Sequence, residues 1–171
     1  IRTELLKINN VNDNQFVVFY STSASPKEDF EAIDYLVKEL KGQENIKLLF
    51  GFHPKDGSSK DFLSKLQKIA QDGIIADFGK LENIEAVSAL TAGNKGLYLG
   101  VKTSMLVDVA LTRANMANIN LHHNGLYSKN FAGLSREISG EKRELSSLID
   151  EIKSKGSISN SKGIMQYDNP N

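Results

Sequence analysis

Short apolar runs alternate with longer amphipathic stretches along most of this chain of 171 residues. This rhythm constrains the fold more than any other feature of the sequence. Most of the runs are rich in β-branched and aromatic residues and show no polar–apolar alternation. Strands that are apolar at consecutive positions are buried on both faces, which is typical of a parallel sheet covered by helices. Five strands are expected, at residues 15–20, 46–50, 74–78, 96–100 and 117–121.

The amphipathic stretches between these runs carry signals for where helices begin and end. The first helix is expected to begin at Pro26, because a missing N–H needs no partner in a first turn, and to end at Gly42. Further helices are expected from Ser58 or Ser59 to Gly73, over residues 84–90 before Gly93, from Thr103 or Ser104 to about Arg113, and, as a long polar helix, over about 130–155.

Together these elements predict an α/β fold. We expect a Rossmann-like, doubly wound, mainly parallel sheet of about five strands in three layers, with right-handed crossovers. Residues 1–10 are expected to form a lead-in, residues 11–155 the domain, and residues 156–171 a flexible tail, because the tail is rich in Ser, Asn and Gly and has no apolar period. Since the chain begins with Ile1 rather than Met, we expect a processed protein or a fragment of a longer one.

Composition excludes several classes of function. The 21 Lys and Arg residues balance the 21 Asp and Glu residues, which argues against nucleic acid as a partner. The absence of cysteine excludes disulfides, zinc ribbons, iron–sulfur clusters and cysteine nucleophiles. No apolar run approaches the roughly 20 residues of a transmembrane helix. We therefore expect a cytoplasmic location, or one at the periphery of a membrane.

Ligands of open parallel sheets bind at the carboxyl ends of the strands, which directs attention to the segments that follow the expected strands. The strongest anion site there is Lys102-Thr103-Ser104, which opens a helix after Gly100 and offers free N–H groups with two hydroxyls. A ligand-free N-cap explains the same pattern and is commoner.

His53 follows the second expected strand and is fixed by Pro54. An imidazole there can donate to a phosphate or protonate a leaving group near neutral pH, although a surface turn explains the same residues equally well. The sequence has neither a dinucleotide fingerprint nor a Walker phosphate loop, and no acidic cluster for a divalent ion. Neither a cofactor nor a metal is therefore expected.

These segments resemble the nucleotide-binding C-terminal half of bacterial sialyltransferases, which have the two-Rossmann GT-B architecture. They are more distantly similar to polysialyltransferases and to CDP-glycerol glycerophosphotransferases. Those families share a strand followed by His-Pro and a later strand followed by a hydroxyl pair that opens a helix. The matching segments here are residues 49–54 and 100–106, with residues 83–87 resembling the segment that carries a ribose-binding glutamate.

The resemblance implies metal-independent transfer of a sugar, sialic acid from its CMP donor, to a carbohydrate acceptor. It places the general base in an N-terminal Rossmann half that this chain does not contain, so no catalytic base is assigned. His53 is the residue that would stabilise the leaving group. The implied nucleotide-binding residues are Ser21 and Thr22 facing the donor, His53 with Pro54 at its phosphate, Glu85 at the ribose, and Thr103 and Ser104 at the remaining phosphate oxygens.

Two alternatives stay open. A transferase that uses a CDP-activated polyol donor would use the same phosphate site. A non-catalytic Rossmann-like interaction module would use none of these residues for chemistry, so that Thr103 and Ser104 would serve only as caps and His53 as a turn residue.

Overall fold

The computed structural model describes residues 1–23, 25–52, 59–81, 83–101, 105–122 and 136–158. Six parallel strands form one sheet in the order β3-β2-β1-β4-β5-β6. The strands are β1 Phe16–Ser21, β2 Ile46–Gly51, β3 Ile75–Phe78, β4 Gly96–Gly100, β5 Met116–Ile119 and β6 Arg136–Ile138. The predicted doubly wound, Rossmann-like fold is therefore confirmed, with six strands where about five were expected.

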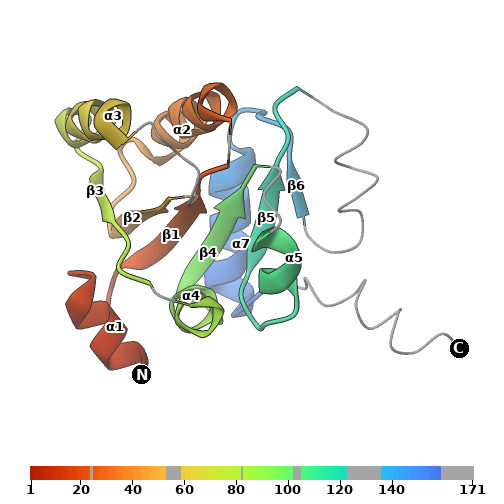
Figure 1. Cartoon of the computed structure of the whole chain (residues 1–171). Coiled ribbons are helices and arrows are strands. Elements are labelled where there is room, and N and C mark those ends of the chain that lie inside the picture. Colours follow the sequence, from red (N-terminus) through yellow and green to blue (C-terminus); the bar gives the residue numbers. More distant parts are fainter. Residues whose placement is uncertain (24, 53–58, 82, 102–104, 123–135, 159–171) are drawn as a thin grey trace, which may run out of the picture.

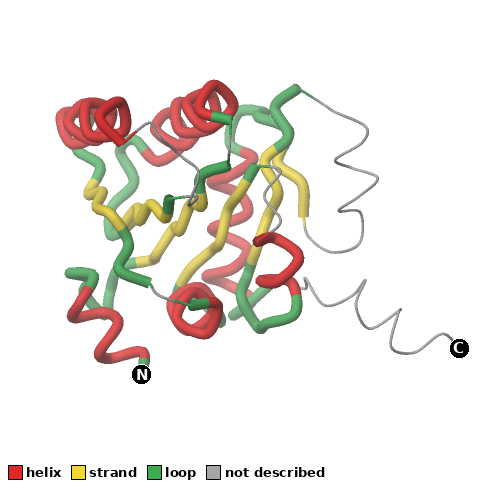
Figure 2. Tube along the Cα trace, viewed as in Figure 1, coloured by secondary structure: helices red, strands yellow, loops and turns green. Residues whose placement is uncertain are grey.

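Helices cover both faces of the sheet, as Figures 1 and 2 show. One face packs against α2 (Pro26–Leu40), α3 (Ser59–Gln71) and α7 (Glu144–Lys155), and the other against α1 (Arg2–Ile8), α4 (Ile84–Thr91) and α5 (Met105–Ala110). Alternate residues of each strand supply the two cores. In β1, Val18 and Tyr20 face α2, whereas Val17 and Phe19 face α4 and α5.

The sixth strand replaces the beginning of the long helix that was expected over about 130–155. In β6 only Ile138 is buried, while Arg136 and Glu137 are exposed, so the sequence lacks the apolar run that marks the other strands. Helix α7 begins later, at Glu144, after Arg143 adopts a left-handed φ of 69°. The carboxylate of Glu144 accepts hydrogen bonds from the N–H groups of Ser139 (2.8 Å) and Gly140 (3.0 Å), which fixes the turn between β6 and α7.

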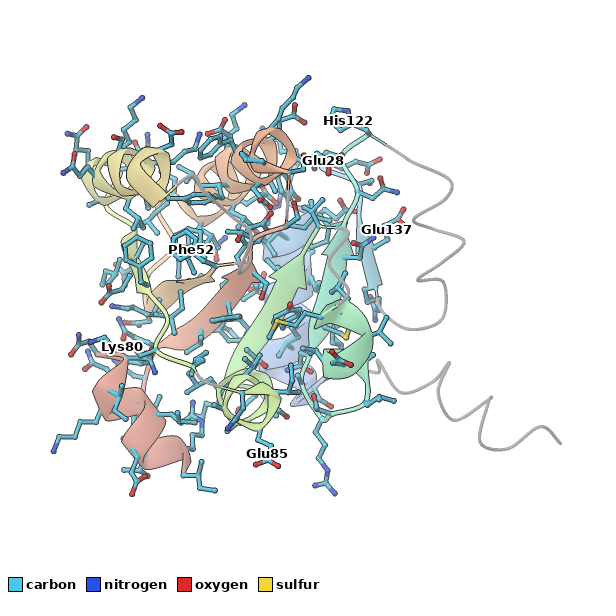
Figure 3. The ribbon with its side chains drawn as sticks, viewed as in Figure 1. Glu28, Phe52, Lys80, Glu85, His122 and Glu137 are labelled. Atoms are coloured by element: carbon cyan, nitrogen blue, oxygen red, sulfur yellow. The ribbon has the colours of Figure 1, made fainter. Side chains whose placement is uncertain are left out.

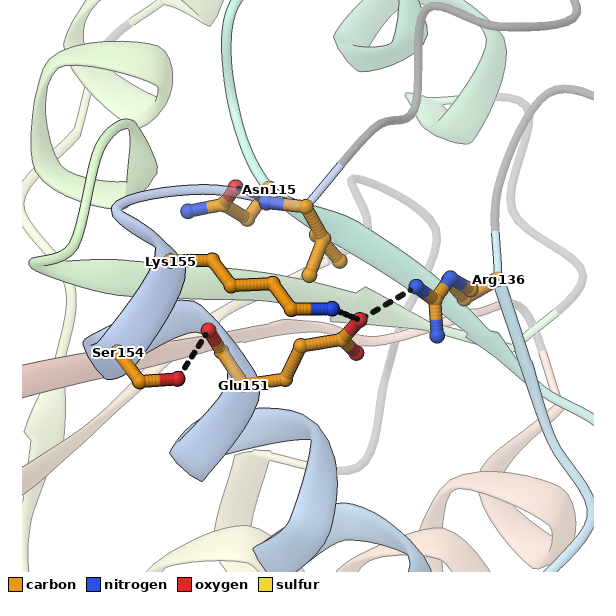
Figure 4. A network of polar contacts seen from close by, with 6 residues as sticks. Asn115, Arg136, Glu151, Ser154 and Lys155 are labelled. Atoms are coloured by element: carbon orange, nitrogen blue, oxygen red, sulfur yellow. Dashed lines mark hydrogen bonds and ion pairs between the residues drawn. The ribbon is translucent and has the colours of Figure 1, made fainter.

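Ion pairs join β6 to α7 at the edge of the sheet (Figure 4). The guanidinium of Arg136 lies 2.9 Å from the Glu151 carboxylate, and the Lys155 ammonium lies 3.2 Å from it. The hydrogen bond from Arg136 is the largest cause that holds the pKa of Glu151 below its ordinary value.

Helix α5 is shorter than expected. It ends at Ala110 rather than near Arg113, because the N–H groups of Leu111 and Thr112 bond to carbonyls three residues back, those of Asp108 and Val109. Six residues sum to only a weak helix dipole, so an anion at the beginning of α5 depends on side chains and local amides more than on the dipole.

Both ends of the described chain pack against the domain. Leu6 of α1 is buried in the core beneath α4. Ile158 is also buried, and its N–H donates a 2.9 Å hydrogen bond to Oδ1 of Asn115. The remainder of the expected tail, residues 159–171, lies outside the described residues. None of the described helices combines the length with the apolar character that crossing a bilayer requires.

Candidate functional site

The strand order reverses its direction between β1 and β4. From β1 the chain runs outward to β2 and β3 on one side and returns to β4, β5 and β6 on the other. Ser21 ends β1 in register with Gly51 on one side and Gly100 on the other. The carboxyl ends of strands at such a switch point are where doubly wound sheets bind ligands, so this edge is the candidate site.

One row of residues crosses the sheet at this edge. Ser21 pairs with Gly100, and Gly100 pairs with Asn118 of β5. Residues of one register row share a face, and this row lies on the face of α5. Because adjacent strands are about 4.8 Å apart, the Cα atoms of Ser21 and Asn118 lie about 10 Å apart, separated by a residue without a side chain.

The side chain of Met105, the first residue of α5, covers Ser21. The Ser21 hydroxyl lies 3.5 Å from the Met105 sulfur, and Ser21 is buried. The Tyr98 hydroxyl lies next to that of Ser21 but makes no hydrogen bond of ordinary geometry. A ligand that contacts Ser21 directly therefore has to displace Met105, whose unbranched thioether side chain repacks readily.

The turn after β1 is held by a buried acid. Asp29, in the first turn of α2, accepts a 2.6 Å hydrogen bond from the Tyr20 hydroxyl and two from the N–H of Ser23, at 2.9 and 3.0 Å. Thr22 is buried as well, and its N–H donates to the carbonyl of Gly51. The amide of Ser23 thus binds a carboxylate and is not free to bind a phosphate.

A small pocket lies between the beginning of α2 and the end of β5. Its lining residues are Glu28, Glu31, Val101, Ile119, Asn120, Leu121 and His122. One carboxylate oxygen of Glu28 is buried without a hydrogen bond, whereas Glu31 pairs with His122, whose side chain is 66% exposed. Figure 3 shows Glu28 and His122 close together at one end of the view. The enclosed volume, about 30 Å³, fits a water molecule or a hydroxyl but not a nucleoside.

Glu85 lies in the first turn of α4, where its side chain is exposed. The helix begins there because the side chain of Asn83 accepts a 2.8 Å hydrogen bond from the N–H of Ala86. In Figure 3 Glu85 lies at the opposite end of the view from Glu28 and His122. Its predicted contact with a ribose stays a prediction.

Four of the predicted site residues, His53, Pro54, Thr103 and Ser104, lie outside the described residues. Of the others, Ser21 and Thr22 lie at the switch point, and Glu85 lies on α4. The residue that sequence reasoning missed is Asn118, a buried amide on the same row as Ser21. The sequence did contain a signal for it, because Asn118 is a polar residue within a strand that is predicted to be buried. Within the described parts of the chain, no group of three or more acidic or histidine side chains could hold a metal ion.

Comparison with known proteins gives structural likeness only. No protein-family model matches the sequence, and no curated protein matches it. A structure of a histidine-to-asparagine variant of the wall teichoic acid polymerase TagF soaked with CDPG matches with a TM-score of 0.60 at 14% identity. The match covers 98% of this chain and 40% of that chain, so this chain spans less than half the length of TagF.

A second match is the C-terminal domain of LpcC, a group 1 family glycosyl transferase from Francisella tularensis. The TM-score is 0.58 at 14% identity, and the match covers 99% of this chain and 93% of that domain. At such identities the likeness shows the fold, which is that of the C-terminal Rossmann domain of GT-B enzymes. The expected GT-B resemblance is confirmed at this level, whereas the resemblance to sialyltransferases rests on the sequence motifs alone.

Proposed function

We propose that this chain is the donor-nucleotide-binding domain of a metal-independent transferase of the GT-B type. The observation that carries the proposal is the switch point, where Ser21 meets Gly100 in register immediately before the segment Lys102-Thr103-Ser104. This edge is where doubly wound sheets bind nucleotides, and that segment offers hydroxyls and a cation suited to phosphate.

Each proposed residue has a role in stabilising the leaving nucleotide. Thr103 and Ser104 would donate to phosphate oxygens, and His53 would donate to the oxygen on which charge develops as the bond to the transferred group breaks. Glu85 would accept hydrogen bonds from the ribose hydroxyls. The acceptor hydroxyl would attack from the opposite side and lose its proton to a base outside this chain.

We propose that the donor contains a cytidine nucleotide. Two classes of donor contain one. CMP-sialic acid is the donor implied by the sequence motifs. A CDP-linked polyol is favoured by the likeness to TagF, whose structure was determined after a soak with CDPG. We propose the CDP-linked polyol as the donor, and a carbohydrate or polyol-phosphate chain as the acceptor.

Thermal unfolding with added nucleotides tests the proposal. At about 100 times its Kd a ligand adds about 2.7 kcal/mol of stability, which for a chain of this size raises Tm by about 5–10 °C. CMP, CDP and CDP-glycerol should stabilise the protein, while UMP and UDP should do so much less. A protein that responds to no nucleotide is an interaction module rather than a transferase domain.

Two substitutions locate the site. His53→Ala and Ser104→Ala should each abolish most of the nucleotide-dependent rise in Tm. Ser154→Ala is the matched control, because Ser154 is exposed on α7 and its hydroxyl bonds only to the carbonyl of Glu151. Loss of the response in all three variants would contradict the assignment of His53 and Ser104.

A further inference from the structure

Asn118 is a fully buried amide without a hydrogen bond. The residue is 1% exposed, and both Nδ2 and Oδ1 lack a partner among the residues that the structure describes. An unpaired buried amide costs more free energy than an ordinary hydrogen bond contributes. A leucine, with the same branching and the same number of heavy side-chain atoms, would not carry that cost. The fold alone therefore gives no reason for this amide.

A second buried asparagine nearby shows the contrast. The Nδ2 of Asn115 donates to the carbonyls of Thr91 (3.0 Å), Gly93 (2.6 Å) and Gly96 (2.9 Å), and its Oδ1 accepts from the N–H of Ile158. Asn115 is thus a structural residue that joins the end of α4, the beginning of β4 and the segment after α7. Asn118 has no comparable structural role among the described residues.

The position of Asn118 indicates a ligand. It lies in register with Gly100, beyond which lies Ser21, at the carboxyl edge of the switch point. Tyr98, two residues before Gly100 on the same face, has a buried hydroxyl that is also unpaired. These two polar groups therefore lie next to Gly100, where the backbone carries no side chain and a substrate group can approach closely.

We propose that Asn118 binds the transferred part of the donor, a polyol phosphate, and so helps to determine donor specificity. This inference rests on the proposed function. A carboxamide offers a donor and an acceptor side by side, so Nδ2 can donate to a phosphate oxygen while Oδ1 accepts from a polyol hydroxyl. Strand β5 lies on the side of β4 away from β1, so Asn118 would meet the group beyond the phosphates rather than the nucleoside.

The test is Asn118→Leu, studied with CMP and with CDP-glycerol. The variant should melt at or above the Tm of the wild type, because it removes an unpaired amide, and it should bind CMP as the wild type does. Its affinity for CDP-glycerol should fall by about ten- to a hundredfold, the effect of losing one or two hydrogen bonds to a charged group. Asn118→Val, suited to a strand, is the second variant and should behave in the same way.

Asn115→Leu is the matched control for stability. The same change of residue type there should lower Tm strongly, because it leaves several buried groups without partners. An Asn118→Leu variant that melts well below the wild type would mean that the amide holds a buried water or another structural partner, and would overturn the proposal.

The binding results separate the two proposals. Unchanged affinity of Asn118→Leu for CDP-glycerol, with the wild type binding both ligands, overturns the role of Asn118 and leaves the nucleotide site standing. Equal weakening for CMP and CDP-glycerol overturns the assignment to the transferred group. A wild-type protein that binds neither ligand overturns the proposed function, and the role of Asn118 with it.

Discussion

The hydroxyl of Tyr20 lies 2.6 Å from Oδ1 of Asp29, and both side chains are fully buried. The hydroxyl of Tyr98 is equally buried but, within the described part of the chain, it lies beside the Ser21 hydroxyl without a hydrogen bond of ordinary geometry. These two tyrosines lie on neighbouring strands but face opposite sides of the sheet. They offer a comparison of one paired and one unpaired phenol within a single protein.

Phenylalanine substitutions at these two positions should have opposite effects on stability. Tyr20→Phe should lower the free energy of unfolding by about 1.5–3 kcal/mol, since it removes a hydrogen bond to a carboxylate and leaves a buried charge less satisfied. Tyr98→Phe should be neutral or stabilising by up to about 1 kcal/mol, because it removes only an unpaired hydroxyl. Urea denaturation of both variants measures the difference, and equal losses would contradict the assignment of partners.

The same tyrosines predict alkaline unfolding. Burial is the main cause that raises the pKa of both phenols well above the ordinary value, and the Asp29 carboxylate adds to the effect at Tyr20. The folded state therefore keeps both protons where the unfolded chain loses them, so the stability present below a pH of about 10 falls as pH rises further.

Burial also raises the pKa of Tyr35, and three such groups give a slope of up to about 4 kcal/mol per pH unit. Unfolding by urea at several pH values between 9 and 11.5 (roughly one unit on either side of the ordinary phenol pKa) measures it. Tyr98→Phe should reduce the slope by about a third, since it removes one of three such phenols, and an unchanged slope in that variant would show that other groups titrate.

Gly96 should tolerate no side chain. A Cβ at this position would lie 2.4 Å from the carbonyl oxygen of Leu90 and 2.8 Å from that of Val17, both backbone atoms that cannot move aside. Gly96→Ala should therefore cost more than about 3 kcal/mol, in the range of severe core substitutions. Thermal unfolding, or the yield of folded protein, measures the loss.

The matched control for that variant is Gly73→Ala. Gly73 has a φ of 81° with no atom within 4 Å of the added carbon, so the cost there is only that of a left-handed backbone, about 1–2 kcal/mol. Equal stability of the two variants would contradict the close approach of the Gly96 backbone to the end of α4.

Ile158 should contribute to stability although it follows the last helix. Its side chain is buried, and truncation to alanine removes contacts with the core on the face of α7. Ile158→Ala should cost about 2 kcal/mol or more, whereas Ile1→Ala, at a residue that is 88% exposed, should change stability by less than about 0.5 kcal/mol. Calorimetry of the two variants tests the docking of this segment.

Much of the architecture could be predicted from the sequence, because a strand buried on both faces shows itself as an apolar run. Strands β1, β2 and β4 have such runs, and the positions predicted for β1 to β5 agree with the structure to within about two residues. Strand β6 could not be found this way, since Arg136 and Glu137 are exposed and only Ile138 enters the core. Its charged residues resemble the solvated face of a helix, which is how they were interpreted.

The candidate site could be predicted only in part. The strand-end rule selected Ser21 and Thr22, which lie at the switch point because that rule depends on topology alone, while their contact with a donor stays a prediction. It could not reveal that Met105 covers Ser21 or that Asp29 binds the amide of Ser23, since both contacts join residues from different elements. The lack of a partner for Asn118 is likewise a property of the packed structure and not of the strand.

The acid that closes the turn after β1 has a consequence for how a donor would be recognised. Because Asp29 already satisfies the amide of Ser23 and the phenol of Tyr20, these two groups are not available to a substrate. If the proposed donor binds at this edge, discrimination among donors would fall to the β4 and β5 side, where Tyr98 and Asn118 have no hydrogen-bond partner among the described residues.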